Sequence, residues 1–146
     1  MHIRRWFRSR AARRSAASDH VRTLSRVANE IADGDITGLV VLDVARSLVE
    51  LLDLRDCEFQ LPPFAADDTP CLRRDGRLEL QGTMWDPATI GFPPGGFLVP
   101  VVARGCTEGR YRCTPAGRGK TSLDQVVVAL TLADQTASAL LLDSVA

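Results

Sequence analysis

The stretch at residues 97–114, FLVPVVARGCTEGRYRCT, decides the fold class of this chain. Residues 97–103 form an apolar run typical of a buried strand, and residues 109–114 lead back after a glycine-containing turn at 105–108. Pro100 has no backbone N–H, so it predicts an edge position or a bulge in the first strand. The stretch therefore predicts a β-hairpin, the clearest strand pair in the sequence.

A long helix is predicted after the hairpin. Ser122 at the N-cap and Gln125 three residues later form the capping-box pattern. An apolar face then continues for about 20 residues, which in a helix span about 30 Å. Its members are Leu123, Val126, Val127, Leu130, Ala133, Ala137, Leu140 and Leu141.

A second helix and a strand are predicted before the hairpin. Residues 38–53 have apolar side chains at helical spacing along one face. Residues 55–61 instead alternate in polarity, with Cys57, Phe59 and Leu61 on one side. This alternation predicts a half-buried strand, which the prolines that follow bring to an end.

The order of these elements predicts the fold class. The 146 residues suffice for one domain, since domains commonly have about 100–150 residues. Six of the eight prolines lie in residues 62–95, which predict an irregular region with one strand around 77–81. Strands between flanking helices predict an α+β domain with an antiparallel sheet. We expect the helices on one sheet face and the loops of residues 62–95 near the other.

Composition and motifs exclude several classes of protein. A chain with 45% hydrophobic residues is not wholly disordered. Its uninterrupted apolar runs, such as residues 126–130, are far shorter than the roughly 18–20 residues of a membrane span, so we expect no span. Nucleotide-binding, kinase and hydrolase motifs are absent, and both His residues lie near the N-terminus. We therefore expect no enzymatic activity, no catalytic residues, no metal and no cofactor.

The net charge of zero hides a strong asymmetry. Residues 1–26 carry eight Arg and one acid, whereas the rest of the chain carries ten basic and seventeen acidic side chains. We interpret residues 1–15 as a basic leader or juxtamembrane linker, because Arg beside aromatic residues suits an anionic membrane surface. A solvated tail, a nucleic-acid-binding arm and an organelle transit peptide are the alternatives. The residues expected at a membrane surface are Arg4, Arg5, Trp6, Phe7 and Arg8.

Residues 16–34 predict an N-terminal pairing helix, which precedes the folded domain at residues 35–146. Its apolar residues follow an a/d stripe over about two heptads. In a homodimer this stripe and one face of the last helix would form the interface. The expected interface residues are Val21, Leu24, Ala28, Ile31, Val126, Ala133, Ala137 and Leu140.

Four cysteines, Cys57, Cys71, Cys106 and Cys113, show no C-x-x-C spacing, and no His lies near them. This pattern does not fit a structural zinc site, which needs local pairs of ligands. We interpret the four thiols as small side chains that are buried or half-exposed. Cys106 and Cys113 flank the predicted hairpin turn, so a redox-sensing pair across the hairpin is the alternative.

Four segments carry a resemblance to a known family. They are the helix end LVELL at 48–52 with the strand after it, the strand at 97–101, Gly109-Arg110-Tyr111, and LTLADQTASAL at 130–140. Through these segments, residues 36–143 resemble the GAF domain, a small-molecule-binding and dimerisation module of signalling proteins. More narrowly, the chain is similar to the GAF-like domain of bacterial membrane-associated sensor proteins related to potassium-responsive sensor kinases.

The resemblance implies a GAF-like sheet and a sensory or regulatory role in bacterial signal transduction. The implied location is the cytoplasm, at the inner face of the membrane, and the implied partners are a second copy of the chain and an unidentified small molecule. Nucleic acid is not an expected partner. The sequence has no match to the cyclic-nucleotide motif of such domains, to a bilin-attaching Cys-His pair or to a haem ligand in the folded part.

We expect the ligand pocket on the concave face of the sheet, beside the loops of residues 62–95. A purely structural dimerisation module without a ligand is the alternative function, and a small enzyme is a further one. The expected lining residues are Phe59, Leu61, Trp85, Phe92, Leu98 and Tyr111.

Overall fold

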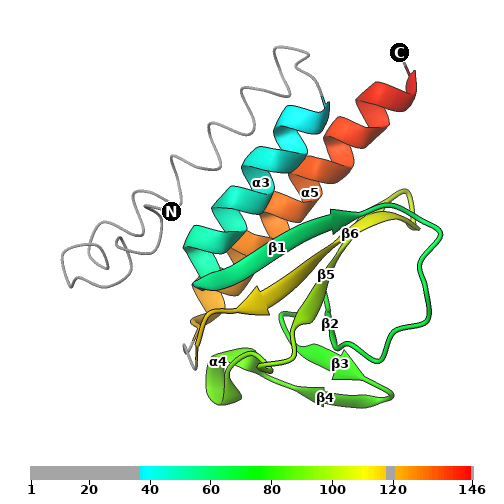
Figure 1. Cartoon of the computed structure of the whole chain (residues 1–146). Coiled ribbons are helices and arrows are strands. Elements are labelled where there is room, and N and C mark those ends of the chain that lie inside the picture. The colour runs from blue at the N-terminus through cyan, green and yellow to red at the C-terminus, as the bar shows by residue number, and fades with distance from the viewer. Residues whose placement is uncertain (1–36, 118–120, 146) are drawn as a thin grey trace.

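The computed structural model describes residues 37–117 and 121–145, and for 143–145 it describes the backbone alone. The predicted leader (residues 1–15) and the predicted pairing helix (residues 16–34) lie outside the described residues. Figure 1 shows the described elements in chain order. They are α3 (Thr37–Leu52), β1 (Leu54–Gln60), β2 (Cys71–Leu72), β3 (Leu78–Leu80), β4 (Thr83–Trp85), α4 (Pro87–Ile90), β5 (Phe97–Ala103), β6 (Cys106–Pro115) and α5 (Leu123–Val145).

The strands form one six-stranded sheet in the order β1-β6-β5-β2-β3-β4. Neighbouring strands are antiparallel except β2 and β5, which pair in parallel at Cys71 and Leu98. The predicted α+β class with a largely antiparallel sheet is confirmed. In Figure 1, α3 and α5 lie over the β1-β6-β5 part of the sheet, while β3, β4 and α4 lie at the far edge.

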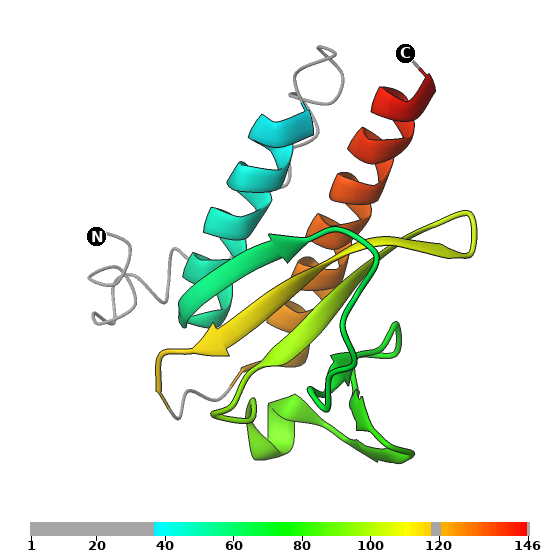
Figure 2. The same ribbon diagram turned by 45° about the vertical axis from the view of Figure 1, so that its right-hand side comes forward.

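The two long helices run antiparallel and are joined near both ends (Figure 2). The Thr37 hydroxyl donates a 3.4 Å hydrogen bond to the carbonyl of Ala139, and the Gln125 side-chain amide donates one of 2.9 Å to the carbonyl of Leu51. The hydrophobic core fills the space between this helix pair and the sheet. Its fully buried members include Val40, Val44, Leu48, Leu78, Phe97, Val99, Tyr111, Val126 and Leu132.

Local sequence signals place most elements correctly. The predicted capping box is confirmed: the Ser122 backbone N–H donates to Gln125 Oε1 at 2.9 Å, and the Gln125 N–H donates to Ser122 Oγ at 3.2 Å. The helix predicted at 38–53 and the strand predicted at 55–61 are each found within one residue, and the strand predicted at 77–81 is found as β3.

The hairpin is confirmed, but its turn lies earlier than predicted. Arg104 and Gly105 both have positive φ, 53° and 78°, as the two central residues of a type I′ turn require. The expected turn at 105–108 is therefore wrong, because β6 already begins at Cys106. Pro100 lies in a central strand, not at an edge of the sheet, and the pairing of β5 with β6 shifts register just after it, between Val101 and Val102.

Two residues of α5 differ from the predicted apolar face. Leu123 and Val127 are more than half exposed, because the buried face of the helix turns toward α3 and β5 along other positions. Residues Leu123–Leu142 are also long and apolar enough to cross a membrane, with a mean hydropathy of 1.5, a property that core helices share, so the expectation that the chain has no membrane span stays a prediction. Packing on the sheet and on α3 accounts for much of this apolar character.

Candidate functional site

The two faces of the sheet are distinguished by the register of its strands, because directly opposed residues point to the same face. Tyr111 of β6 is opposite Phe59 of β1 and Val99 of β5, and its side chain reaches the helices. Arg112, the next residue, is opposite Leu98 and points the other way. We call this second side, opposite the helices, the outer face.

The expected pocket residues Phe59 and Tyr111 face the helices and not a pocket on the outer face. Their rings lie together, with centroids 5.0 Å apart. Tyr111 is fully buried, and its hydroxyl lies 2.8 Å from Thr136 Oγ1 in α5 and 3.4 Å from the carbonyl of Val41 in α3. The expectation that these two rings line a ligand pocket is corrected: they join the sheet to both helices.

The other four expected pocket residues do not come together. Trp85 and Phe92 pack against the hydrophobic core, where the Phe92 ring stacks on Phe97 at 4.0 Å. Leu61 is 62% exposed beyond the end of β1. Leu98 alone of the six lies on the outer face, where it is buried. The predicted alternation of side chains along β1 is confirmed, because Cys57 and Phe59 share one side of the strand. The sequence alone, however, does not show which side of a strand faces the helices.

The outer face instead carries a polar cluster under the loop that joins β1 to β2. Arg112 donates hydrogen bonds to Asp67 Oδ2 and, at 3.2 Å, to Thr69 Oγ1. Thr69 in turn donates to Asp67 Oδ1. Arg110 lies 3.6 Å from the same Asp67 oxygen, Oδ2. One carboxylate of the loop therefore contacts two guanidinium groups of β6.

Further contacts fix the guanidinium of Arg110. Its Nε donates a 2.7 Å hydrogen bond to Gln60 Oε1 at the end of β1, and its Cζ lies 4.3 Å from the centroid of the Phe64 ring. The side chain is only 13% exposed, against 35% for Arg112 and 21% for Asp67. We call these six residues the outer-face cluster: Gln60, Phe64, Asp67, Thr69, Arg110 and Arg112.

The electrostatics of the cluster favour an ionised carboxylate. The hydrogen bond from Thr69 lowers the pKa of Asp67 most, partial burial opposes this shift, and the guanidiniums of Arg112 and Arg110 lower the pKa further. Cys71 lies near the cluster on β2, and burial raises the pKa of its thiol, so the thiol is protonated at neutral pH. Within the described residues no three metal-binding side chains come together. The cluster is suited to hold an anionic group.

Sequence reasoning missed this cluster. Asp67 belongs to no recognisable motif in the sequence, and Arg110 stands out only as part of the family pattern Gly109-Arg110-Tyr111. The alternation Arg110-Tyr111-Arg112 in a strand does place both arginines on one face. The partner loop, however, lies more than forty residues earlier in the chain.

The interface residues expected on α5 are largely occupied within one chain. Val126, Ala133 and Ala137 are buried in the core, and Leu140 packs against it. These side chains therefore do not offer the interface that we predicted for a second copy. The expected interface residues Val21, Leu24, Ala28 and Ile31 lie outside the described residues, as do the expected membrane-surface residues Arg4, Arg5, Trp6, Phe7 and Arg8.

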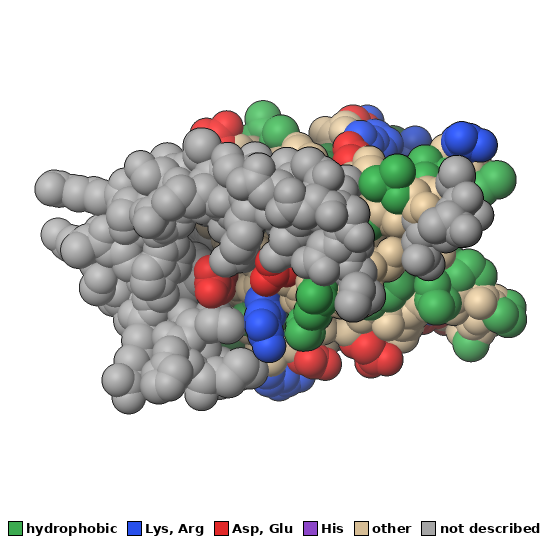
Figure 3. Space-filling model, turned by 90° about the horizontal axis from the view of Figure 1, so that it is seen from above, with side chains coloured by type: hydrophobic (Ala, Val, Ile, Leu, Met, Phe, Trp, Pro, Cys, Tyr) green, Lys and Arg blue, Asp and Glu red, His purple; other side chains and the backbone are tan. Residues whose placement is uncertain are grey.

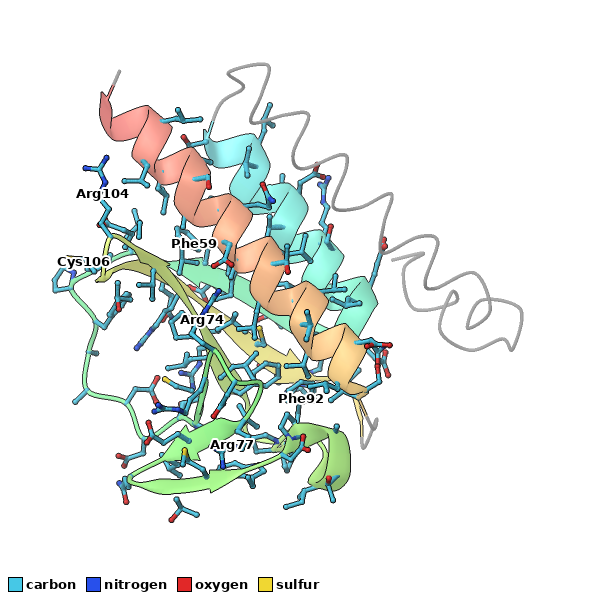
Figure 4. The ribbon with its side chains drawn as sticks, turned by 180° about the vertical axis from the view of Figure 1, so that it is seen from behind. Phe59, Arg74, Arg77, Phe92, Arg104 and Cys106 are labelled. Carbon is cyan, nitrogen blue, oxygen red and sulfur yellow. The ribbon has the colours of Figure 1, made fainter. Side chains whose placement is uncertain are left out.

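The alternative of a thiol pair between Cys106 and Cys113 is wrong, whereas Cys57, Cys71 and Cys113 are buried or half-buried as expected. Cys113 lies opposite Cys57 of β1, with the two sulfur atoms 3.8 Å apart. Cys106 is exposed next to the turn and lies opposite Ala103. In Figure 4 it is labelled near Arg104 at the tip of the hairpin, on the side of the molecule far from Phe92.

Comparison with protein-family models, with curated proteins and with solved structures finds no match to this chain. The functional conclusion therefore depends on the geometry of the described residues.

Proposed function

We propose that the chain is a non-catalytic, GAF-like regulatory domain of a bacterial signal-transduction protein. In this proposal it binds a small anionic molecule at the outer-face cluster and pairs with a second copy of itself. The observation that carries the proposal is the double contact of Asp67 with Arg110 and Arg112. A loop carboxylate there fills a place that the carboxylate or phosphate of a ligand could take.

Binding of a ligand anion to Arg110 and Arg112 would change the position of the 61–70 loop. A ligand anion competes with Asp67 for the guanidiniums, so it favours a state in which the 61–70 loop has moved. A ligand shifts such an equilibrium only by the difference in its affinity for the two states. Asp67 supplies that difference, because it occupies the site in one state and leaves it in the other.

The strand β6 supplies a short path from the cluster to the helices. Tyr111 lies between the two arginines in sequence and points to the opposite face. Its hydroxyl contacts Thr136 of α5 and the carbonyl of Val41 in α3. A shift of β6 under Arg110 and Arg112 would therefore act directly on the contacts of both helices.

Exposed apolar side chains at one end of the helix pair support self-association. Leu39 and Leu42 of α3 and Leu142 of α5 are each about half exposed. The bond between Thr37 and Ala139 places the start of α3 beside the last turns of α5. Figure 3 looks down on this end of the molecule, where hydrophobic side chains of the described part reach the surface beside charged ones. We propose a second copy of the chain as their partner.

The alternative is a purely structural dimerisation module. It is favoured by the same cluster, since the carboxylate of Asp67 itself pairs with both arginines. In that case the cluster serves to hold the 61–70 loop on the sheet. The two functions differ in their response to added anions.

The proposed binding of a small anion is tested by thermal unfolding in inorganic phosphate or citrate, with sodium chloride at equal ionic strength as the reference. A ligand that binds only the folded chain raises its unfolding temperature. We expect phosphate or citrate to raise the midpoint above the chloride reference in the natural chain and in Arg77→Ala, but not in Arg112→Ala. Arg77 is the matched control because its guanidinium pairs with Asp75 in the β2–β3 turn. Equal midpoints in all three salts would exclude a site for these anions.

The proposed self-association is tested by light scattering, which measures the mass of the protein in solution. We expect a dimer for the full chain and a smaller dimer fraction for a chain with Leu39 and Leu42 changed to Ser. A copy without residues 1–33 shows how much the N-terminal segment contributes. A monomer at all concentrations would remove the dimer from the proposal. A dimer without any response to anions would favour the structural module.

A further inference from the structure

Two thiols lie against each other between β1 and β6. Cys57 and Cys113 are directly opposed residues of the antiparallel pair, and their sulfur atoms are 3.8 Å apart. Both point to the helix-facing side of the sheet, in the same row as Phe59 and Tyr111. Neither thiol belongs to the outer-face cluster, so the proposed ligand site does not account for the pair.

The two thiols differ in how solvent reaches them. Cys57 is half-buried on β1, which is the last strand at its edge of the sheet. Cys113 is fully buried on β6, the neighbouring strand. Burial and the neighbouring Cys57 raise the pKa of Cys113, which therefore stays protonated at neutral pH. A small reagent that enters from the edge of the sheet meets Cys57 first, with Cys113 directly behind it.

We propose that Cys57 and Cys113 are a reversible redox site that forms a disulfide when the protein meets a hydroperoxide. Cys57 sulfur, as thiolate, attacks one oxygen of hydrogen peroxide; the O–O bond breaks, and the departing hydroxide takes up a proton and leaves as water. Cys113 sulfur then attacks the sulfenic sulfur of Cys57. The S–O bond breaks, and the second hydroxide takes the Cys113 proton. Two thiols and one peroxide give one disulfide and two water molecules.

The geometry of the strand pair permits this bond. Directly opposed residues of antiparallel strands have Cβ atoms about 4.5–5.5 Å apart, and a disulfide needs about 3.5–4.5 Å. A small approach of β1 to β6 is sufficient, and β1 is free to make it as an edge strand. The usual spacing of opposed residues is at or above the upper limit for a disulfide, so we expect a strained bond that small thiols reduce readily.

The position of the pair gives the bond a structural consequence. β1 follows α3 directly through Asp53, and β6 carries Tyr111, which contacts α3 and α5. A bond from Cys57 to Cys113 therefore fastens β1 and the end of α3 to the strand that contacts both helices. This redox input goes beyond the proposed ligand binding and does not depend on it.

The test is mass spectrometry of the full chain after mild oxidation in the folded state. The reduced protein is treated with hydrogen peroxide, free thiols are blocked by alkylation, and the chain is digested without a reductant. We expect a peptide pair joined through Cys57 and Cys113, and its loss after treatment with dithiothreitol. A chain with Cys71→Ser and Cys106→Ser should form the same link, since it keeps both thiols of the site.

A variant without Cys57 is the negative control. Cys57→Ala removes the link and should leave Cys113 alkylated or unreacted, with no new disulfide from Cys113. Circular dichroism of this variant checks that it is folded. The proposal is overturned if Cys57 and Cys113 stay reduced while exposed Cys106 is oxidised. It is equally overturned if Cys57 reaches the sulfinic acid without forming a disulfide, because Cys113 then fails to reach the sulfenic sulfur.

Discussion

The side-chain amide of Gln125 joins the start of α5 to the end of α3, since its nitrogen donates a 2.9 Å hydrogen bond to the carbonyl of Leu51. The oxygen of the same amide accepts from the backbone N–H of Ser122. One residue thus satisfies a free donor at one helix terminus and a free acceptor at another, which both termini require when they lie against the core. The capping box was visible in the sequence, whereas its second bond was not.

Two substitutions of Gln125 distinguish the contributions that these two hydrogen bonds make to stability. We expect Gln125→Ala to lower the free energy of unfolding by about 1–2 kcal/mol, because it removes a cap and leaves the Leu51 carbonyl without its donor. Gln125→Glu keeps an acceptor for Ser122 but has no N–H for Leu51, so it should cost about half as much. Urea unfolding followed by circular dichroism measures both. Equal losses for Ala and Glu would mean that only the bond to Leu51 matters.

Gly109 of β6 is expected to tolerate no side chain. A Cβ atom there would lie 2.4 Å from Cζ and 2.7 Å from Cε1 of Phe59, whose ring also contacts Tyr111. Overpacking of this kind costs about 1–3 kcal/mol, so we expect a loss of that size for Gly109→Ala. Gly95→Ala is the matched control, because a Cβ atom at Gly95 meets nothing within 4 Å. Thermal unfolding of both variants gives the comparison, and similar midpoints would show that Phe59 moves aside.

The sequence allowed the local elements to be predicted, because their signals lie within a few residues. The Ser122–Gln125 pattern gave the start of α5, and the apolar spacing of residues 38–53 gave α3 within one residue. Cross-strand pairing depends instead on register between distant segments. The pairing of Cys113 with the nearby Cys106, which the sequence left open as an alternative, is therefore wrong, since Cys113 lies opposite Cys57.

The candidate site was harder to predict for the same reason. The loops of residues 62–95 are predicted near the sheet face opposite the helices, and Asp67 and Thr69 do lie there against Arg112. The aromatic residues Phe59 and Tyr111 were expected beside that loop, but they face the helices. Alternation shows that two residues share a face, and only the packed structure shows which face is covered.

The buried hydroxyls of Tyr111 and Thr136 are expected to stabilise the fold as a pair. Their oxygen atoms are 2.8 Å apart, and both residues are fully buried. Tyr111→Phe should lower the free energy of unfolding by about 1–2 kcal/mol, because it leaves Thr136 with fewer partners. Thr136→Val should cost a similar amount. The double variant should cost clearly less than the two single losses combined, and urea unfolding of the four chains measures this coupling. Additive losses would contradict a direct bond.

The contacts of Asp67 with Thr69, Arg112 and Arg110 make the stability of the fold depend on pH. The hydrogen bond from Thr69 and the two guanidiniums lower the pKa of Asp67 in the folded chain, whereas the unfolded chain has the ordinary value of about 3.9. The ionised carboxylate therefore contributes stability above pH ~4, and this contribution is lost as the pH falls through the lower, folded-state pKa. At neutral pH we expect Asp67→Asn to lower the free energy of unfolding by about 1–2 kcal/mol.

Urea unfolding of the natural chain and Asp67→Asn at a series of pH values tests this dependence. The difference between the two chains should be constant near neutral pH and should shrink as the pH falls below about 4, because both then carry an uncharged side chain at this position. Asp68→Asn is the matched control, since the neighbouring Asp68 accepts a longer hydrogen bond of 3.4 Å from Gln81. It should change stability less at every pH. A difference for Asp67→Asn that stays the same down to the most acidic sample would show that its charge does not hold the loop on β6.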